Sequence, residues 1–145
     1  MADVIAELKA LRLHGMAATW AELGEQRNAE VERSRWLLEH MLQAEVSDRA
    51  TRSVQHQMNS AKFPVHRDLA RFDFEVSPVD RKLVTQLANC EFTAAAHNVV
   101  LVGGPGTGKT HLATAIGVAG IGTHGKRVRF YSTVDLVNAL EREKA

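Results

Sequence analysis

The chain has 145 residues, of which 45% are hydrophobic and 24% charged, with a formal net charge of +1. This composition is that of an ordinary globular protein and excludes disordered and fibrous classes. The single cysteine, Cys90, excludes an internal disulfide and a cysteine-based zinc site. The longest apolar run, 99–102, is too short to cross a membrane, and the first residues lack a signal-peptide pattern. We therefore expect a cytoplasmic protein with no membrane partner.

The first 60 residues predict an all-helical region. Ile5, Leu8 and Leu11 recur at helical spacing ahead of Gly15, and a second short helix is expected over 16–23. A stretch from residue 28 to about residue 58 contains neither glycine nor proline and carries one apolar stripe, which predicts a long amphipathic helix. The stripe favours helix packing over ligand binding.

Charge is distributed unevenly along the chain. Residues 1–48 carry nine acidic and five basic side chains, whereas residues 49–71 carry one acidic and five basic ones. A local basic cluster can bind nucleic-acid phosphates through counterion release, and it is also the pattern of a solvated face or a salt-bridged linker. The candidate DNA or phosphate contacts are Arg49, Arg52, Lys62, Arg67 and Arg71.

Residues 61–78 predict an ordered linker, because Pro64 and Pro78 interrupt helices and the phenylalanines there do not recur at helical spacing. Ser77 is expected to cap the next helix, with Pro78 in its first position. Two short strands are then expected at 98–102 and 128–131, separated by a glycine-rich loop and a helix from Lys109 to about residue 124. Ser132 followed by Asp135 predicts the N-cap of a last helix.

The glycine-rich loop carries the strongest functional signal. Residues 103–110 read GGPGTGKT and match the phosphate-binding pattern G-x-x-x-x-G-K-[ST] at every fixed position. Glycines let successive backbone N–H groups face one concavity, and the following helix adds its positive end. Lys109 is expected on the β and γ phosphates of a nucleotide, and Thr110 on Mg²⁺. The alternative is a glycine-rich turn without a ligand. The predicted nucleotide-binding residues are Gly103, Gly104, Pro105, Gly106, Thr107, Gly108, Lys109, Thr110 and His111.

These motifs together resemble one family, the IstB-like transposition helper ATPases of insertion sequences, which are AAA+ proteins close to the DnaC helicase loaders. The resemblance is carried by NVVLVGGPGTGKTHLATAIG, GKRVRFYSTVDLVNAL, AKFP, FDF at 72–74 and LANCEF at 87–92. The start of the chain, LRLHGMAATWAEL, is also similar to the helical N-terminal domain of that family. The resemblance covers nearly the whole chain.

The resemblance implies ATP and Mg²⁺ as ligands and two domains. Residues 1–71 would form a helical domain and linker that binds a transposase or another protein. Residues 72–145 would form an AAA+ nucleotide-binding module that self-associates on ATP binding and engages DNA. Residues 72–74 would lie near the adenine side of the pocket. The Walker B motif, sensor and arginine finger of the family have no counterpart in the sequence, so no catalytic residue is assigned and hydrolysis is left open.

The expected fold class is α/β: an all-α N-terminal domain followed by an incomplete P-loop AAA+ module with right-handed βαβα order. We interpret the chain as the N-terminal half of the family fold. In that fold two further strands separate the first two, so the apolar strand edges would be unpaired. The two strands present could instead pair directly as a right-handed βαβ unit.

Four functions remain open at this point. The first is an ATP-binding helper that assists a transposase on DNA, and the second is a helicase loader with a different protein partner. The third is a small P-loop kinase, although the long helical N-terminus and the lack of an acceptor lid oppose it. The fourth is a non-catalytic fragment that acts as an interaction module or is an inert relic.

Overall fold

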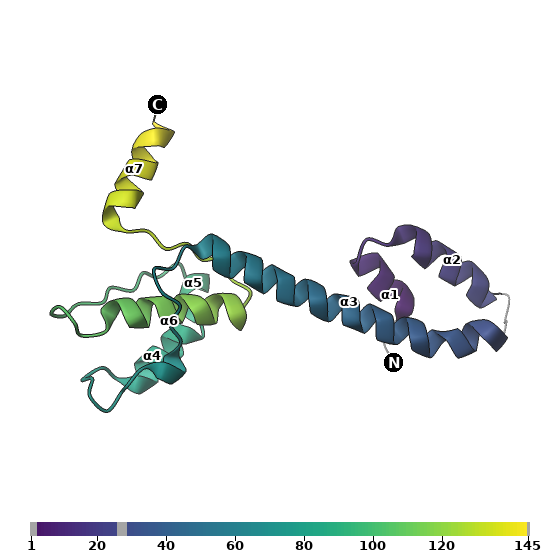
Figure 1. Ribbon diagram of the computed structural model, residues 1–145, viewed down its shortest axis with the longest axis horizontal. Coiled ribbons are helices and arrows are strands. Elements are labelled where there is room, and N and C mark those ends of the chain that lie inside the picture. The colour runs from purple at the N-terminus through teal and green to yellow at the C-terminus, as the bar shows by residue number, and fades with distance from the viewer. Residues whose placement is uncertain (1–2, 26–28, 145) are drawn as a thin grey trace. The chain divides into compact units, whose positions relative to one another are not determined.

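A computed structural model describes residues 3–25 and 29–144 (Figure 1). The chain divides into two compact units, Met1–Ser53 and Val54–Ala145. The long helix α3, Ala29–Ala61, contributes its first residues to one unit and its last residues to the other. None of the described helices combines the length and the apolar character that crossing a bilayer requires.

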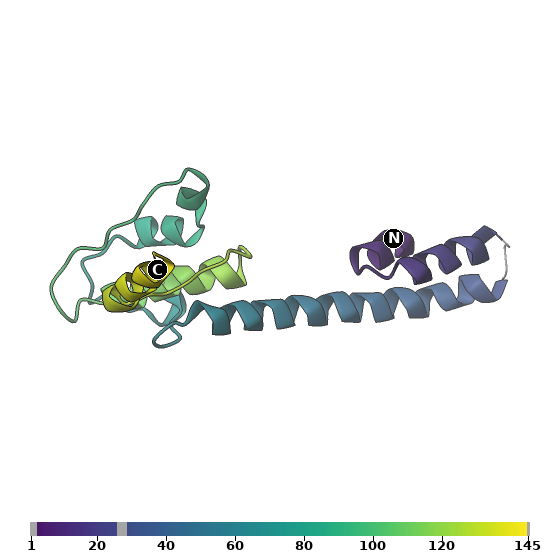
Figure 2. The same cartoon turned by 90° about the horizontal axis from the view of Figure 1, so that it is seen from above.

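The first unit is helical, as the sequence predicts. Helices α1, Val4–Ala10, and α2, His14–Glu25, lie along the first part of α3 in both ribbon views (Figure 2). Asp3 caps α1, because its carboxylate accepts a hydrogen bond of 3.0 Å from the backbone N–H of Ile5. The unit is held together by an apolar core of Val4, Leu8, Leu11, Ala17 and Leu42.

Polar contacts tie α3 to α1 beside that core. The guanidinium of Arg49 donates to the backbone carbonyl of Leu11 at 3.2 Å, and the side-chain amide of Gln43 donates to the Glu7 carboxylate. Leu42 of α3, which is 4% exposed, packs in the core next to these contacts. Leu38 and Leu42 thus use part of the stripe for helix packing, whereas Met41 and Val46 are exposed.

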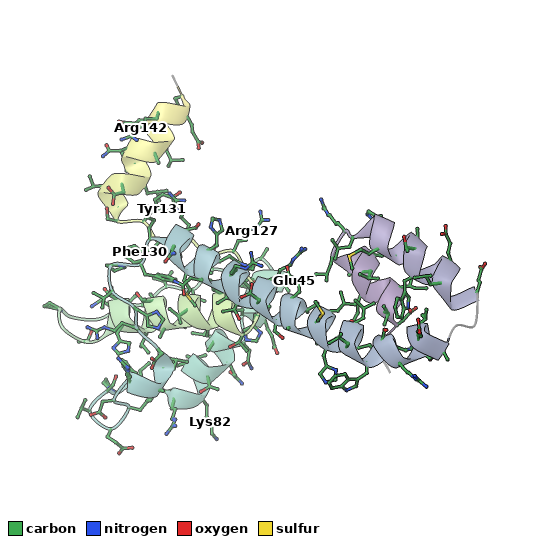
Figure 3. All side chains as sticks on the ribbon, turned by 45° about the vertical axis from the view of Figure 1, so that its right-hand side comes forward. Glu45, Lys82, Arg127, Phe130, Tyr131 and Arg142 are labelled. Carbon is green, nitrogen blue, oxygen red and sulfur yellow. The ribbon has the colours of Figure 1, made fainter. Side chains whose placement is uncertain are left out.

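The second unit is organised around helix α6, Lys109–Gly122. The 3₁₀ helix η1, Leu69–Arg71, and helix α4, Arg81–Ala88, pack on α6, and the short helix α5, Glu91–Ala94, follows α4. Figure 1 shows α4, α5 and α6 gathered together, and Figure 3 labels Lys82 in the first turn of α4. The last helix, α7, spans Thr133–Glu143 and has no buried residue. The buried face of α6 is formed by Leu112, Thr114, Ala115, Gly120 and Ile121.

Glycines inside α6 are sites of close packing. A Cβ at Gly117 would lie 2.9 Å from the Phe63 ring and 3.2 Å from Val128, and one at Gly120 would lie 3.3 Å from the Cys90 sulfur. Glycine in a helix interior costs about 1 kcal/mol relative to alanine. Here that cost is offset by contacts that any larger residue would block.

The predicted α/β class is wrong for this structure, which has no β-strand in residues 3–25 and 29–144. Residues 98–102 and 128–131 are irregular and do not pair with each other, so the expected βαβ unit is also absent from the described chain. A strand needs a neighbour for its backbone groups, and a two-stranded sheet is marginal in water. Val100 and Val102 are accordingly 80% and 91% exposed.

The segment 128–131 instead uses helices as its partners. Val128 packs on Gly117 and Gly120 of α6, and the backbone N–H of Phe130 donates to the carbonyl of Ala61 at 2.7 Å. Figure 3 shows Phe130 where the chain passes the end of α3. The two helices thus give Val128 a packing surface and give the Phe130 N–H a hydrogen-bond acceptor, which a neighbouring strand would otherwise provide.

Two predicted caps have different outcomes. Ser132 caps α7 as predicted, since its Oγ accepts from the Asp135 N–H at 3.1 Å and donates to the Asp135 carboxylate at 2.7 Å. Ser77 does not cap a helix: α4 begins at Arg81 and is capped by Asp80, which accepts from the Lys82 N–H at 2.8 Å. Asp80 provides a carboxylate acceptor near the positive end of the helix, which stabilises the start of α4 there.

We expect Gly117→Ala to lower the free energy of unfolding by about 1 kcal/mol or more, because the added methyl group overlaps the Phe63 ring. Gly122→Ala in the same helix is the matched control, since the nearest atom, Met58 Cε, is 3.8 Å away. Urea unfolding followed by circular dichroism measures both. Equal or greater stability of Gly117→Ala would contradict the packing described for α6.

Candidate nucleotide-binding site

The backbone of residues 103–108 turns sharply into α6. Gly106 and Gly108 have φ values of +74° and +85°, in the left-handed region that residues with a Cβ seldom adopt. Gly108 is the N-cap residue of α6, and no side chain in the described part of the chain caps the N–H groups of the first turn. A helix N-terminus with uncapped N–H groups binds anions through those groups and through its dipole. The loop therefore has a backbone suited to a phosphate.

The Lys109 ammonium lies over this loop. It donates hydrogen bonds to the carbonyl of Gly104 and, at 3.3 Å, to the hydroxyl of Thr107. The Thr107 hydroxyl in turn donates to the same Gly104 carbonyl at 2.8 Å. Both side chains thus reach the Gly104 carbonyl, and Lys109 places its positive charge beside the N-terminus of α6.

Two surface hollows border the loop, and both are lined in part by Thr107 and Lys109. The first has a volume of about 290 Å³ and is lined by residues 106–111. The second has a volume of about 380 Å³ and is lined by 77–79, 100–103, Thr107, Lys109 and Leu112. Ligand pockets in proteins typically start at about 300 Å³. The loop therefore has open space next to it for a phosphate group and for a larger group attached to the phosphate.

The linker before α4 contacts the last glycine of the loop. Phe72 Cε2 lies 2.8 Å from the position that a Cβ at Gly108 would take. The Phe72 ring also meets the His111 ring edge to face, with centroids 5.2 Å apart. His111 Nε2 donates to the backbone carbonyl of Asp68 at 3.1 Å. The motif indicates His111 through its position after Thr110, but no sequence signal predicts that Phe72 touches Gly108.

The candidate DNA contacts do not all belong to one compact unit. Arg49 and Arg52 lie on α3 in the first unit, where Arg49 pairs with Glu45 at 2.6 Å and Arg52 with Asp48 at 2.7 Å. Figure 3 labels Glu45 on α3. The other three, Lys62, Arg67 and Arg71, belong to the second unit. Arg71 lies 3.7 Å from the Asp68 carboxylate, and its side chain is 76% exposed.

The family of IstB-like ATP binding proteins matches residues 6–145. The chain belongs to this family. The resemblance inferred from the sequence motifs is therefore confirmed, and the match includes the phosphate loop and the helices before it.

Individual relatives agree with the family match. A Geobacillus stearothermophilus protein, named as an ATP-binding protein of insertion sequence IS5376, is 33% identical over 91% of this chain and 53% of its own length. A Pseudomonas aeruginosa protein, named for insertion sequence IS21, is 39% identical over 71% of this chain and 39% of its own. A Sinorhizobium fredii insertion sequence protein is 34% identical over 92% of this chain and 45% of its own. The chain thus spans about half the length of these relatives or less.

We expect Gly108→Ala to destabilise the second unit by about 1–3 kcal/mol, because a residue with a Cβ is strained at positive φ and its methyl group would overlap Phe72. Gly104→Ala is the matched control in the same loop, where the nearest atom, Thr107 Cγ2, is 4.0 Å from the new Cβ. Thermal unfolding of both variants makes the comparison. A melting temperature of Gly108→Ala as high as that of Gly104→Ala would contradict the loop geometry.

Proposed function

We propose that this chain binds ATP through residues 103–110 and belongs to the machinery that assists a transposase on DNA. The observation that carries the proposal is the placement of the Lys109 ammonium over a loop whose glycines lead into the uncapped N-terminus of α6. This arrangement combines a positive side chain, a helix dipole and unpaired N–H groups, which is the set that phosphate binding requires. The match to a family of ATP binding proteins supports the same nucleotide.

The residues of the loop take separate parts in this proposal. The first-turn N–H groups of α6 would hold the β-phosphate, and Lys109 would neutralise the β and γ oxygens. The bonds from Lys109 to Gly104 and Thr107 would be exchanged for bonds to the phosphates. Gly103, Pro105 and Gly106 would shape the loop around them.

Mg²⁺ fits the same site through Thr110. This residue lies exposed in the first turn of α6 and lines the hollow of about 290 Å³ together with Lys109. Mg²⁺ is commonly held by few protein oxygens, with water and substrate phosphates completing its shell. We therefore propose that the Thr110 hydroxyl binds a Mg²⁺ ion that accompanies ATP.

The proposal concerns nucleotide binding and assigns no catalytic residue. Asp135 directly follows Val134, and its carboxylate accepts a hydrogen bond from the hydroxyl of Ser132, the N-cap of α7. That carboxylate is thereby engaged in the first turn of the helix. A base or water-positioning group for hydrolysis is not part of the proposed site.

The proposed protein and DNA partners are inferred from the family and not from the geometry of the nucleotide site. We propose that residues 1–71, a helical domain and linker, bind a transposase. We propose further that residues 72–145 form the nucleotide-binding module and self-associate, and that the basic residues between 49 and 71 contact DNA phosphates. The relatives compared above are named from insertion sequences, which favours a transposition helper over a helicase loader or a metabolite kinase.

We expect Lys109→Ala to weaken binding of a fluorescent ATP analogue with Mg²⁺ by about ten- to a hundredfold, since a charged hydrogen-bonding group is lost from the phosphate site. Lys126→Ala, an exposed lysine beyond the other end of α6, is the matched control and should bind as the unaltered chain does. Fluorescence titration at fixed salt gives the three dissociation constants. Equal affinity of the Lys109→Ala variant and the unaltered chain would refute the site.

A further inference from the structure

We propose that Phe72 and His111 are positioning residues for the phosphate loop, which they hold from the linker side. Together with Asp68 they form what we call the linker clamp (Asp68, Phe72 and His111). The clamp fixes Gly108, the residue at which the loop becomes α6. The inference rests on the proposed function only for the identity of the ligand, because the clamp itself is a feature of the chain.

The Phe72 ring makes close steric contact with Gly108. The edge of the Phe72 ring reaches Gly108 so closely that a Cβ there would be 2.8 Å from Cε2 and 3.3 Å from Cζ. Gly108 has φ of +85°, and glycine by itself samples left- and right-handed conformations about equally. A ring this close to the Cβ position of Gly108 removes part of that freedom. Phe72 thereby selects the conformation in which the N–H groups of loop and helix converge.

A hydrogen bond and a ring contact extend the clamp into the first turn of α6. His111 Nε2 donates to the Asp68 carbonyl at 3.1 Å, and the His111 ring stands at 88° to the Phe72 ring. The backbone N–H of Leu112 donates to the Gly108 carbonyl at 2.9 Å, so Gly108 and His111 belong to the same helical turn. Phe72 is thus held against both ends of the turn that carries Lys109 and Thr110.

Local hydrogen bonds and ring contacts hold the linker in place around Asp68 and Phe72. The Asp68 carboxylate caps η1 by accepting from the Arg71 N–H at 3.0 Å, and the Phe72 N–H donates to the Leu69 carbonyl at 3.1 Å. Phe74 supports the Phe72 ring in a T-shaped contact at 4.8 Å, and the Arg81 guanidinium lies 5.4 Å from the Phe74 ring centre. Aromatic pairs of this kind stabilise by more than their buried area.

The clamp makes a different prediction from base stacking. If Phe72 contacted an adenine base, its removal would weaken ATP but not a ligand that has phosphates alone. If Phe72 positions the loop, its removal weakens both ligands by the same factor. Inorganic tripolyphosphate, which has no base, separates the two roles.

The experiment compares Phe72→Leu with Phe63→Leu in the full chain. Phe63 is the matched control, because its ring packs 2.9 Å from the Cβ position of Gly117 in the same helix but lies away from the loop in sequence and contact. We expect Phe72→Leu to weaken both Mg²⁺–ATP and tripolyphosphate by about tenfold, and Phe63→Leu to change either by less than about twofold. Loss of ATP binding alone, or of neither ligand, in Phe72→Leu overturns the proposal.

A second pair of variants tests the hydrogen bond. His111→Gln keeps an N–H donor close to the position of Nε2, whereas His111→Leu removes it. We expect His111→Gln to bind tripolyphosphate more tightly than His111→Leu while the two melt at similar temperatures. Equal affinities of the two variants would remove His111 from the clamp.

A measurement without nucleotide keeps the clamp separate from the proposed function. The three-bond HN–Hα couplings of Gly108, which report its φ angle, should change in Phe72→Leu and stay the same in Phe63→Leu. If the unaltered chain binds neither ATP nor tripolyphosphate, the proposed function fails, and these couplings alone decide the clamp. Unchanged Gly108 couplings in Phe72→Leu contradict the clamp whatever the chain binds.

Discussion

The second unit depends on the close approach of side chains to glycines of α6 and its N-cap. Phe72 rests on Gly108, Phe63 on Gly117, and Cys90 on Gly120, so segments from three places in the sequence meet one helix. Contacts this short require the missing Cβ, and dense packing of this kind holds neighbouring elements in register. The helix that is fixed in this way is also the one whose N-terminus carries the phosphate loop. The contacts that pack the second unit therefore also hold the helix that carries the phosphate site.

The loop could be predicted from the sequence because its geometry is set locally by glycine spacing and by the helix that follows. The long helix α3 could be predicted for the same reason, since its pattern is continuous and uninterrupted. The strands could not, because a strand exists only with a partner, and residues 128–131 lie against α6 and the end of α3 instead. The contact of Phe72 with Gly108 joins residues far apart in the chain, and no local pattern indicates it.

Membership in a family of ATP binding proteins agrees with the geometry of the loop, which suits a phosphate group. The family match rests on sequence over residues 6–145, whereas the loop argument rests on φ angles, a helix N-terminus and the position of one ammonium group. Every group in the proposed phosphate site lies within residues 103–111. We therefore propose that phosphate binding is a property of this loop and helix, held in place by the linker clamp, and does not need a completed β-sheet.

That claim is tested most directly by calorimetric titration of the 145-residue chain with ATP, ADP and AMP in the presence of Mg²⁺. If most of the binding energy comes from the β and γ phosphates, ATP should bind saturably with one site per chain. AMP, which has neither phosphate, should bind at least about a hundredfold more weakly, and ADP should lie between them. AMP binding as tight as that of ATP, or no heat of binding from ATP to a chain that still unfolds cooperatively, would contradict the account.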